Sequence, residues 1–259
     1  MADCILGPII LKPLILITND DGYRSEGIRI LARRLEMEAE VFIVAPEEER
    51  SAVSHALTIR DPVRITEISP KVFAVHGTPA DCVILAVRTV LPRKPDLVVS
   101  GINHGRNLGD DIMYSGTVAG AREACYLDLP AFSISQNLSR RKAKFGIAAE
   151  VSAQIAERIM KEGLPDGTFL NINVPADSKP LGMKWTHQGA RISRSSLSEC
   201  PGPRGNRFYW IGEDKAAEES DMEEGSDYEA IKKGYISITP LQRDQTSYIV
   251  LNNLDRLGF

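Results

Sequence analysis

Short apolar runs alternate with amphipathic segments through the first two thirds of the chain. The runs are rich in Val, Ile and Leu and bounded by polar residues, which is typical of buried parallel strands. They predict strands at residues 14–18, 41–45, 72–75, 97–100, 131–135 and 169–174. The intervening segments carry apolar residues at helical spacing, the longest from about residue 142 to residue 161. Alternation of this kind predicts an α/β fold, a doubly wound and mostly parallel sheet covered by helices.

The pattern changes after Pro175. Short β-like pieces at 183–186, 208–211 and 235–239 are separated by loops rich in Gly, Pro and Ser. The strongly acidic stretch 213–229 contains a single Lys and predicts a solvated loop or a short exposed helix. We therefore expect three parts: an N-terminal extension (1–12), an α/β catalytic core (13–175) and a smaller β-rich C-terminal region (176–259). The last part is either a subunit contact, through which the chain oligomerises, or a simple surface hairpin.

Composition narrows the possible partners. The chain has 259 residues, 43% of them hydrophobic, and a formal net charge of -4, so it offers no basic surface for a nucleic-acid polymer or a membrane. The apolar N-terminal stretch is interrupted by Pro8, Lys12 and Pro13, unlike a signal peptide or a membrane span. The four cysteines have no zinc-site spacing, which favours a reducing cytoplasm. Cys82 and Cys125 lie in apolar helical patterns and are expected to be buried.

Two adjacent carboxylates, Asp20 and Asp21, follow the first predicted strand directly. Polar residues at the carboxyl end of a buried strand lie at the sheet edge where α/β proteins bind ligands. Neighbouring Asp residues repel one another unless a cation neutralises them, and divalent ions prefer oxygen ligands. The segment therefore predicts a site for Mg²⁺ or Mn²⁺. The alternative is a turn followed by an Asp helix cap.

Three further polar segments fall at the same predicted edge. They supply Ser51, Asn103 and the sequence Ser115-Gly116-Thr117 at the start of an apolar helix. Hydroxyl and amide oxygens extend the candidate metal ligands to Asp20, Asp21, Ser51 and Asn103. A helix start with hydroxyls and free N–H groups suits a phosphate. Taken alone, the Ser-Gly-Thr helix start and the Asn103 loop each favour a common helix cap or loop over a ligand site. The glycine-rich phosphate motifs of P-loop and dinucleotide-binding proteins are absent from the sequence.

Five motifs together resemble the SurE family of stationary-phase survival nucleotidases. They are TNDDG at 18–22, AP at 45–46 with RS at 50–51, GTPADCV at 77–83, SGIN at 100–103 followed by Asn107, and YSGTV at 114–118. The resemblance implies a Rossmann-like fold and a metal-dependent 5′- or 3′-nucleotidase acting on nucleoside monophosphates. It implies that Asp20, Asp21, Ser51 and Asn103 hold the metal. It also implies a homodimer or homotetramer that exchanges C-terminal segments. Ala52 stands where many members have Gly, which bears on loop geometry.

The mechanism we expect is attack of a metal-activated water on a phosphate monoester. Asp20 or Asp21 would accept the proton of that water, with Asp20 preferred, while Asn107, Ser115, Gly116 and Thr117 hold the phosphate. One alternative makes an Asp the nucleophile, through a phospho-aspartate. Another is a non-catalytic nucleotide- or phosphate-binding regulatory protein. The Asp pair disfavours it, because binding phosphate alone would favour Arg or Lys.

The remaining polar residues near these motifs have simpler interpretations. His55 is a candidate to orient the phosphate or protonate the leaving group, but a structural role is favoured. His76 and His104 are expected to be structural or peripheral. Asp81 fits a capping box with Thr78, a role that needs no catalysis. Arg50 and Arg106 are candidate anion contacts or plain loop residues.

Overall fold

The computed structural model describes residues 12–136, 145–176, 179–190, 195–202, 206–213 and 223–253. All but the last residue of the predicted N-terminal extension lie outside the described residues. The main sheet has nine strands in the order β3-β4-β2-β1-β5-β6-β7-β11-β8. The strands are β1 (Leu14–Thr18), β2 (Glu40–Pro46), β3 (Ile65–Ser69), β4 (Val72–Val75), β5 (Leu97–His104), β6 (Ala131–Gln136), β7 (Thr168–Val174), β8 (Met183–Trp185) and β11 (Ile236–Gln242).

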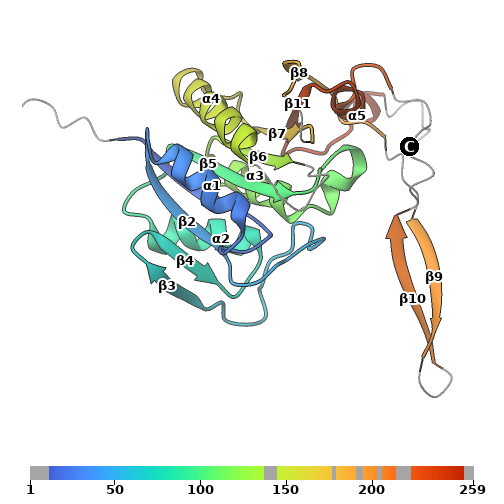
Figure 1. Cartoon of the computed structure of the whole chain (residues 1–259), viewed down its shortest axis with the longest axis horizontal. Helices are drawn as coiled ribbons and strands as arrows, with labels where there is room; N and C mark the ends of the chain where they lie inside the picture. Colours follow the sequence, from blue (N-terminus) through green and yellow to red (C-terminus); the bar gives the residue numbers. More distant parts are fainter. Residues whose placement is uncertain are drawn as a thin grey trace, which may run out of the picture.

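The six strands from β4 to β7 pair in parallel, which confirms the predicted doubly wound α/β sheet. All six predicted strands are present, and β5 is the middle strand of the whole sheet (Figure 1). The sequence did not predict β3, which pairs antiparallel with β4 at the sheet edge. Four of its five residues are exposed, so β3 has no apolar run from which a strand could be inferred.

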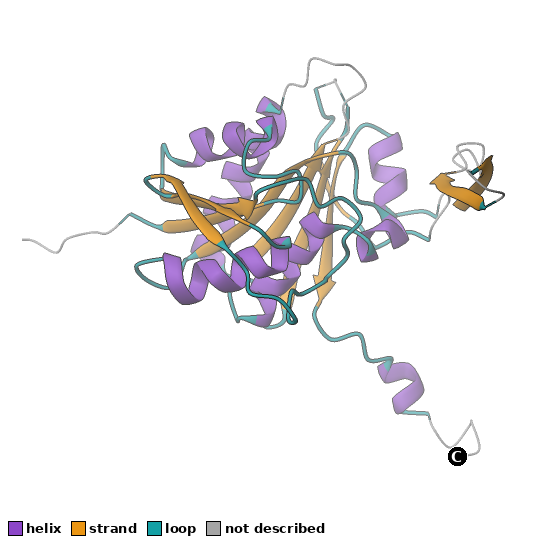
Figure 2. Ribbon diagram, turned by 90° about the horizontal axis from the view of Figure 1, so that it is seen from below, coloured by secondary structure: helices purple, strands orange, loops and turns teal. Residues whose placement is uncertain are grey.

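Helices cover both faces of the sheet (Figure 2). On one face α1 (Glu26–Leu35) and α4 (Gly146–Glu162) pack with Ile15 and Val99 in one apolar core. On the other, α2 (Pro79–Leu85), the π-helical turn η1 (Ala86–Val90) and α3 (Gly116–Tyr126) pack with Leu16 and Val98 in a second core. Alternate residues of a central strand thus enter different cores, and for this reason both faces are apolar. No helix among the described residues is both long and apolar enough to cross a membrane.

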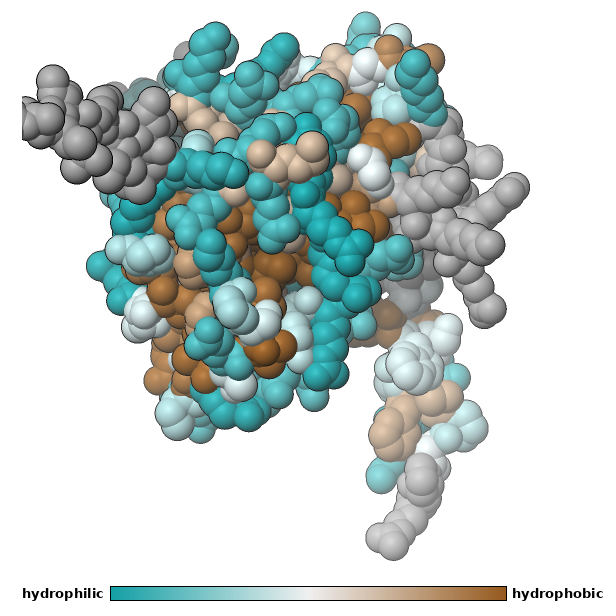
Figure 3. Space-filling view, turned by 60° about the vertical axis from the view of Figure 1, so that its left-hand side comes forward, coloured by the Kyte–Doolittle hydropathy of each residue, from teal (hydrophilic) through white to brown (hydrophobic). Residues whose placement is uncertain are grey.

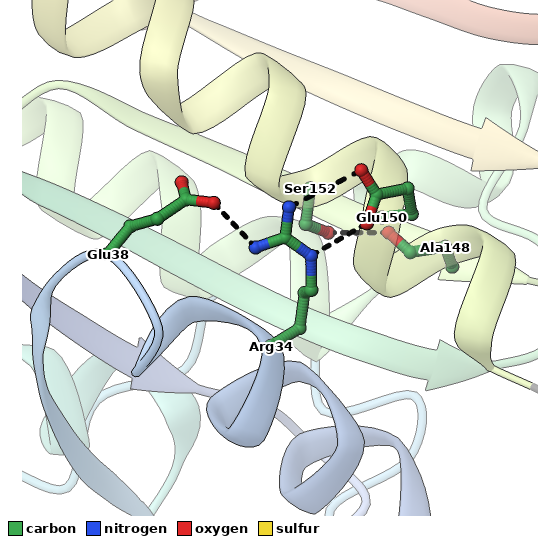
Figure 4. A network of polar contacts seen from close by, with 5 residues as sticks. All are labelled: Arg34, Glu38, Ala148, Glu150 and Ser152. Carbon is green, nitrogen blue, oxygen red and sulfur yellow. Dashed lines mark hydrogen bonds and ion pairs between the residues drawn. The ribbon is translucent and has the colours of Figure 1, made fainter.

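Arg34 forms ion pairs with two glutamates, one of which lies on the neighbouring helix α4 (Figure 4). Arg34 on α1 donates to Glu38, in the turn after its helix, and to Glu150 on α4, with N–O distances of 2.8 and 2.7 Å. A second guanidinium nitrogen of Arg34 lies 3.3 Å from the other oxygen of Glu150. These contacts raise the pKa of Arg34 and lower that of Glu150. The pair with Glu150 links α1 to α4 at the surface, above the apolar core that they share.

The C-terminal region contributes to the main sheet and also forms a separate hairpin. Strand β11 pairs antiparallel with β7, and β8 pairs parallel with β11, so both extend the main sheet. Strands β9 (Ser195–Pro201) and β10 (Arg207–Glu213) form an antiparallel two-stranded sheet, which stands apart from the body in Figures 1 and 3. This small sheet confirms the predicted β-rich appendage. The domain division at residue 175 stays a prediction.

The C-terminal region also contains two short helices, α5 (Asp227–Lys232) and α6 (Tyr248–Leu251). Residues 214–222 of the predicted solvated loop or exposed helix (213–229) lie outside the described residues, and the prediction is wrong at its C-terminal end. Asp227 and Tyr228 are 0% and 6% exposed, respectively. They are buried because they pack on the loop that follows β5, a contact described below.

Candidate functional site

Strand order reverses beside β1, and this position defines the candidate site. From β1 the chain winds through β2 to β4 on one side, then returns to β5 on the other. Loops that leave the carboxyl ends of β1 and β5 therefore diverge and leave a crevice between them. A pocket of about 590 Å³ lies there. It is lined by Asp20, Asp21, Glu49, Ser51, Ala52, Asn103, His104, Gly105, Arg106, Asn107, Asp111, Tyr114, Ser115, Ile211 and Gly212.

Asp20 is held by Thr117 at the start of α3. The Thr117 backbone N–H donates to one carboxylate oxygen at 2.9 Å, and its hydroxyl donates to the other. Asp20 is only 4% exposed, and burial raises its pKa to about 6. The Thr117 bonds oppose that rise, while the charge of Asp21 adds to it. Asp20 is therefore mostly ionised at neutral pH, in a place where a carboxylate is poorly solvated.

Close approach of α3 to Asp20 requires Gly116. A Cβ atom at that position would lie 2.9 Å from the Asp20 Cβ and 3.0 Å from its Oδ2. Ser115 begins the helix as its N-cap, accepting a hydrogen bond from the Val118 N–H at 3.0 Å. The sequence Ser115-Gly116-Thr117 thus combines a helix cap, a contact that admits no side chain, and a double donor to Asp20.

Asp21 and Ser51 lie on the more open side of the pocket. Asp21 Oδ2 accepts the backbone N–H of His104 at 3.1 Å. Burial raises the pKa of Asp21, the His104 N–H lowers it, and the negative charge of Glu49 raises it. Ser51 is exposed and donates to Glu49 Oε1 at 2.6 Å. The two loops are tied together because the Arg50 N–H donates to the Asp20 carbonyl oxygen at 2.7 Å.

Asn103 and Asn107 come from the end of β5 and the loop beyond it. Pairing of β5 with β6 shifts between Ser100 and Asn103, so the strand end departs from the regular sheet. Asn103 Nδ2 donates to the Gly105 carbonyl at 3.0 Å, which orients the side-chain amide. Its Oδ1 is the atom that could serve as a ligand. Asn107 is 8% exposed and lines the pocket.

A buried amide network positions Asn107. Its side-chain Nδ2 donates to Ser135 Oγ at 2.8 Å, and its backbone N–H donates to Asn173 Oδ1 at 2.8 Å. Its carbonyl oxygen accepts from Asn171 Nδ2 at 2.8 Å and from Asn173 Nδ2 at 2.9 Å. Strands β6 and β7 therefore fix a residue of the β5 loop. A buried network in which the members satisfy one another holds a loop rigidly.

Asp227, from α5, fixes the far end of the same loop. Its carboxylate accepts backbone N–H groups from Gly109 at 2.8 Å, Gly189 at 3.0 Å and Tyr228 at 2.8 Å. The Arg106 guanidinium lies over the Tyr228 ring, 5.9 Å from its centroid. Burial raises the pKa of Asp227, and the three N–H donors oppose the rise. A residue of the C-terminal region thus supports a wall of the pocket.

The pocket gathers the four predicted metal ligands, Asp20, Asp21, Ser51 and Asn103, on its lining. Two predicted phosphate-binding residues, Asn107 and Ser115, line it as well. Gly116 and Thr117 are buried and lie behind Asp20. The roles assigned to these residues stay predictions. Among the residues that the structure describes, no three His, Cys, Asp or Glu side chains are grouped to hold a metal, so any ion here would need the Ser51 and Asn103 oxygens.

Several neighbouring residues have structural roles, as the sequence favoured. Asp81 and Thr78 form the predicted capping box at the start of α2. His55 pairs with Glu123 at 2.7 Å, stacks on the Tyr126 ring and is not part of the pocket lining. Cys82 and Cys125 are buried free thiols.

Sequence reasoning missed four contributors: Glu49, Asn171, Asn173 and Asp227. Glu49 stands within the motif segment that supplies Ser51, so its acidic side chain was an available signal. Asn171 and Asn173 are polar residues in a predicted buried strand, which also marks them as unusual. The role of Asp227 had no local signal, because its partner Gly109 is 118 residues away.

The fold and pocket define an α/β protein with a small-molecule site at the switch point of a doubly wound sheet. The family model described as Survival protein SurE matches residues 15–195. The chain belongs to the SurE family, which confirms the resemblance of its motifs.

Relatives match over nearly their whole length. The 5′-nucleotidase SurE of Geobacter metallireducens is 46% identical over 249 residues, 95% of this chain and 97% of that protein. The 5′-nucleotidase SurE of Pelobacter propionicus is 44% identical over 238 residues, 90% of this chain and 95% of that protein. The crystal structure of the SurE protein from Aquifex aeolicus has a TM-score of 0.84 at 40% identity, covering 95% of this chain and 100% of that one.

Proposed function

We propose that this protein is a 5′-nucleotidase, which hydrolyses nucleoside monophosphates to nucleoside and phosphate in the pocket beside β1 and β5. The observation that carries the proposal is the adjacent pair Asp20 and Asp21 in that pocket, with neutral oxygen donors around them. Relatives at 44% and 46% identity bear the name 5′-nucleotidase SurE. The alternative of a non-catalytic nucleotide-binding protein is not favoured.

The residues of the pocket fit a divalent cation such as Mg²⁺ or Mn²⁺. Burial raises the pKa of both Asp20 and Asp21, because their charged forms are poorly solvated. A bound cation would stabilise these charges in place of water. The donor set of two carboxylates, the Ser51 hydroxyl and the Asn103 amide oxygen consists of hard oxygen ligands. When bound, the ion supplies Lewis-acid chemistry that acidifies water and offsets phosphate charge.

Asp20 is the residue we assign to proton transfer. It is the more buried of the two carboxylates, and Thr117 fixes both of its oxygens. In the reaction, water oxygen bonds to phosphorus as the bond to the nucleoside oxygen breaks. Asp20 accepts the proton that the water loses and releases it to solvent, and the nucleoside oxygen takes up a proton from solvent. Asn107 and Ser115 hold the phosphate in line, while Gly116 and Thr117 support that wall from behind.

We further propose a homodimer or homotetramer in the cytoplasm, built through the C-terminal region. Supporting this, the β9–β10 hairpin exposes Leu197, Phe208 and Trp210, which are 68%, 50% and 71% exposed and do not line the catalytic pocket. Figure 3 shows the hairpin standing out from the body, and a cluster of exposed apolar side chains is typical of an interaction surface. The free thiols of Cys82, Cys125 and Cys200 suit a reducing compartment.

The test is a matrix of phosphate release from a panel of nucleoside monophosphates with Mn²⁺, with Mg²⁺ and with chelator. Asp20→Asn and Asp21→Asn should each abolish release while leaving the circular dichroism spectrum unchanged. Asp61→Asn, an exposed acid outside the pocket, is the matched control and should stay active. Near-normal turnover in either pocket variant would overturn the proposal.

Stereochemistry at phosphorus separates direct water attack from a phospho-aspartate. With a substrate whose phosphorus is made chiral by isotopic labelling, a single in-line displacement by water inverts the configuration, whereas two successive displacements through an Asp retain it. Retention would contradict the direct mechanism and leave the nucleotidase activity standing.

A further inference from the structure

A second pocket, of about 670 Å³, lies near the end of β11. Its lining residues come from η2 (Gly109–Met113), α3, β7, β11 and the segments around them. They are Ile112, Met113, Arg122, Pro165, Thr168, Gln188, Pro240, Leu241, Gln242, Asp244 and Gln245. None of them lines the candidate catalytic pocket, so the two cavities are distinct.

Arg122 is the unusual member of this lining. The residue is 6% exposed, and its buried Nε has no hydrogen-bond partner. Its guanidinium makes only weak contacts. Nη2 lies 4.0 Å from Met113 Sδ, and Cζ lies 5.8 Å from the Phe169 ring centroid. Within the part of the chain that the structure describes, no carboxylate forms an ion pair with Arg122. Burial consequently lowers the pKa of its guanidinium.

A buried guanidinium without a counter-charge is costly, because buried charges are stable only when paired and hydrogen-bonded. Asp244 is the one acid of the pocket lining, and its carboxylate accepts the Thr246 N–H at 2.9 Å and the Tyr248 hydroxyl. The other polar lining residues are neutral: Thr168, Gln188, Gln242 and Gln245. The Thr246 and Tyr248 donors lower the pKa of Asp244 to about 2, so Asp244 is a carboxylate that already has its own donors. The pocket therefore offers the positive charge of Arg122, one internally hydrogen-bonded negative charge, neutral hydrogen-bond donors and open volume.

We propose that this pocket binds a free oxyanion of the phosphate or carboxylate class, with Arg122 as its cationic partner. A planar guanidinium gives such an oxyanion two parallel donors. The neighbouring amides and the Thr168 hydroxyl complete the set of hydrogen bonds. The site is separate from the proposed catalysis, because neither Arg122 nor the other lining residues belong to the catalytic pocket.

The first test measures thermal unfolding of the full-length protein against inorganic phosphate, with chelator present and chloride adjusted to constant ionic strength. Wild type should show a saturable rise, about 2 to 4 °C at ten times the dissociation constant. Arg122→Met should lose that component, and Arg122→Lys should retain a weaker one. Arg93→Met is the matched control, since it also removes one cation but from an exposed ion pair with Asp96, and should behave as wild type. Equal responses in wild type and Arg122→Met would overturn the proposal.

The second test keeps the proposal falsifiable if Arg122→Met does not fold. Crystals of the wild-type protein soaked in selenate should show an anomalous selenium peak within hydrogen-bond distance of the Arg122 guanidinium. A pocket without that peak, or one in which an acidic side chain of a second copy pairs with Arg122, would refute a free-anion site. Failure of either test leaves the nucleotidase proposal untouched, because its own test reads phosphate release.

Discussion

Thr117 donates both its hydroxyl and its backbone N–H to Asp20, one to each carboxylate oxygen. The pair joins the first turn of α3 to the end of β1 across 97 positions of the sequence. It holds the carboxylate in one orientation and offsets part of the cost of burying it. Thr117 thus orients the Asp20 carboxylate and opposes the rise in its pKa that burial causes.

Replacing Thr117 should therefore change the pH profile as well as the rate. Thr117→Val keeps the shape and the backbone N–H but removes the hydroxyl, so the pKa of Asp20 should rise. We expect kcat/KM at pH 7 to fall about 10-fold or more and the acid limb of its pH profile to move to higher pH. Thr117→Ser retains the donor and should stay near wild type. An unshifted acid limb in Thr117→Val would show that the hydroxyl does not tune Asp20.

The raised pKa of Asp20 predicts how metal binding depends on pH. Because its folded-state pKa of about 6 exceeds the ordinary value of 3.8, the metal-free fold binds this proton more tightly than the unfolded chain. Its stability therefore falls as pH rises from about 4 to about 6, by about 3 kcal/mol for this group. A cation replaces that proton, so Mn²⁺ should raise the melting temperature strongly at pH 7.5 and progressively less below pH 6. Differential scanning fluorimetry with and without Mn²⁺ measures this. A rise of the same size at pH 5 would contradict it.

Gly116→Ala should be far more disruptive than an ordinary helix Gly→Ala change. The added methyl would meet Asp20 at 2.9 Å, so either α3 or the carboxylate must shift. We expect a loss of about 1–3 kcal/mol in unfolding free energy and a larger proportional loss of phosphate release. Gly146→Ala, at the start of α4 with open space around it, is the control and should be neutral or slightly stabilising. Equal melting temperatures and equal rates of phosphate release in the two variants would contradict this prediction.

Asp227→Ala should weaken the site from a distance. It leaves the N–H groups of Gly109, Gly189 and Tyr228 without their acceptor in a buried place. Urea unfolding should show a loss of about 3–5 kcal/mol, and KM for a nucleotide should rise as the Arg106 loop loosens. Asp61→Ala, on the surface, should do neither. An unchanged KM in a folded Asp227→Ala protein would mean that the loop keeps its shape without this anchor.

Most of the central fold could be predicted from the sequence, because buried parallel strands produce uninterrupted apolar runs. The family and the nucleotidase activity were also predictable, since motif residues such as Asp20 and Asp21 follow one another directly. Strand β3 and the hairpin strand β9 were not predicted, because exposed strands carry no such run. The hydrogen bonds that hold the pocket loop could not be predicted either. The bonds of Asn107 to Asn173, and of Asp227 to Gly109, join residues far apart in sequence.

The bond between Gly109 and Asp227 also bears on the order in which the molecule is assembled. Contacts that span 118 positions close a large loop, and their entropic cost is met late in folding. During synthesis the chain leaves the ribosome from its N-terminus, so the Asp pair emerges long before the residue that anchors the loop opposite it. The nascent protein thus carries its carboxylates first and gains the finished pocket only when nearly nine tenths of the chain has been made.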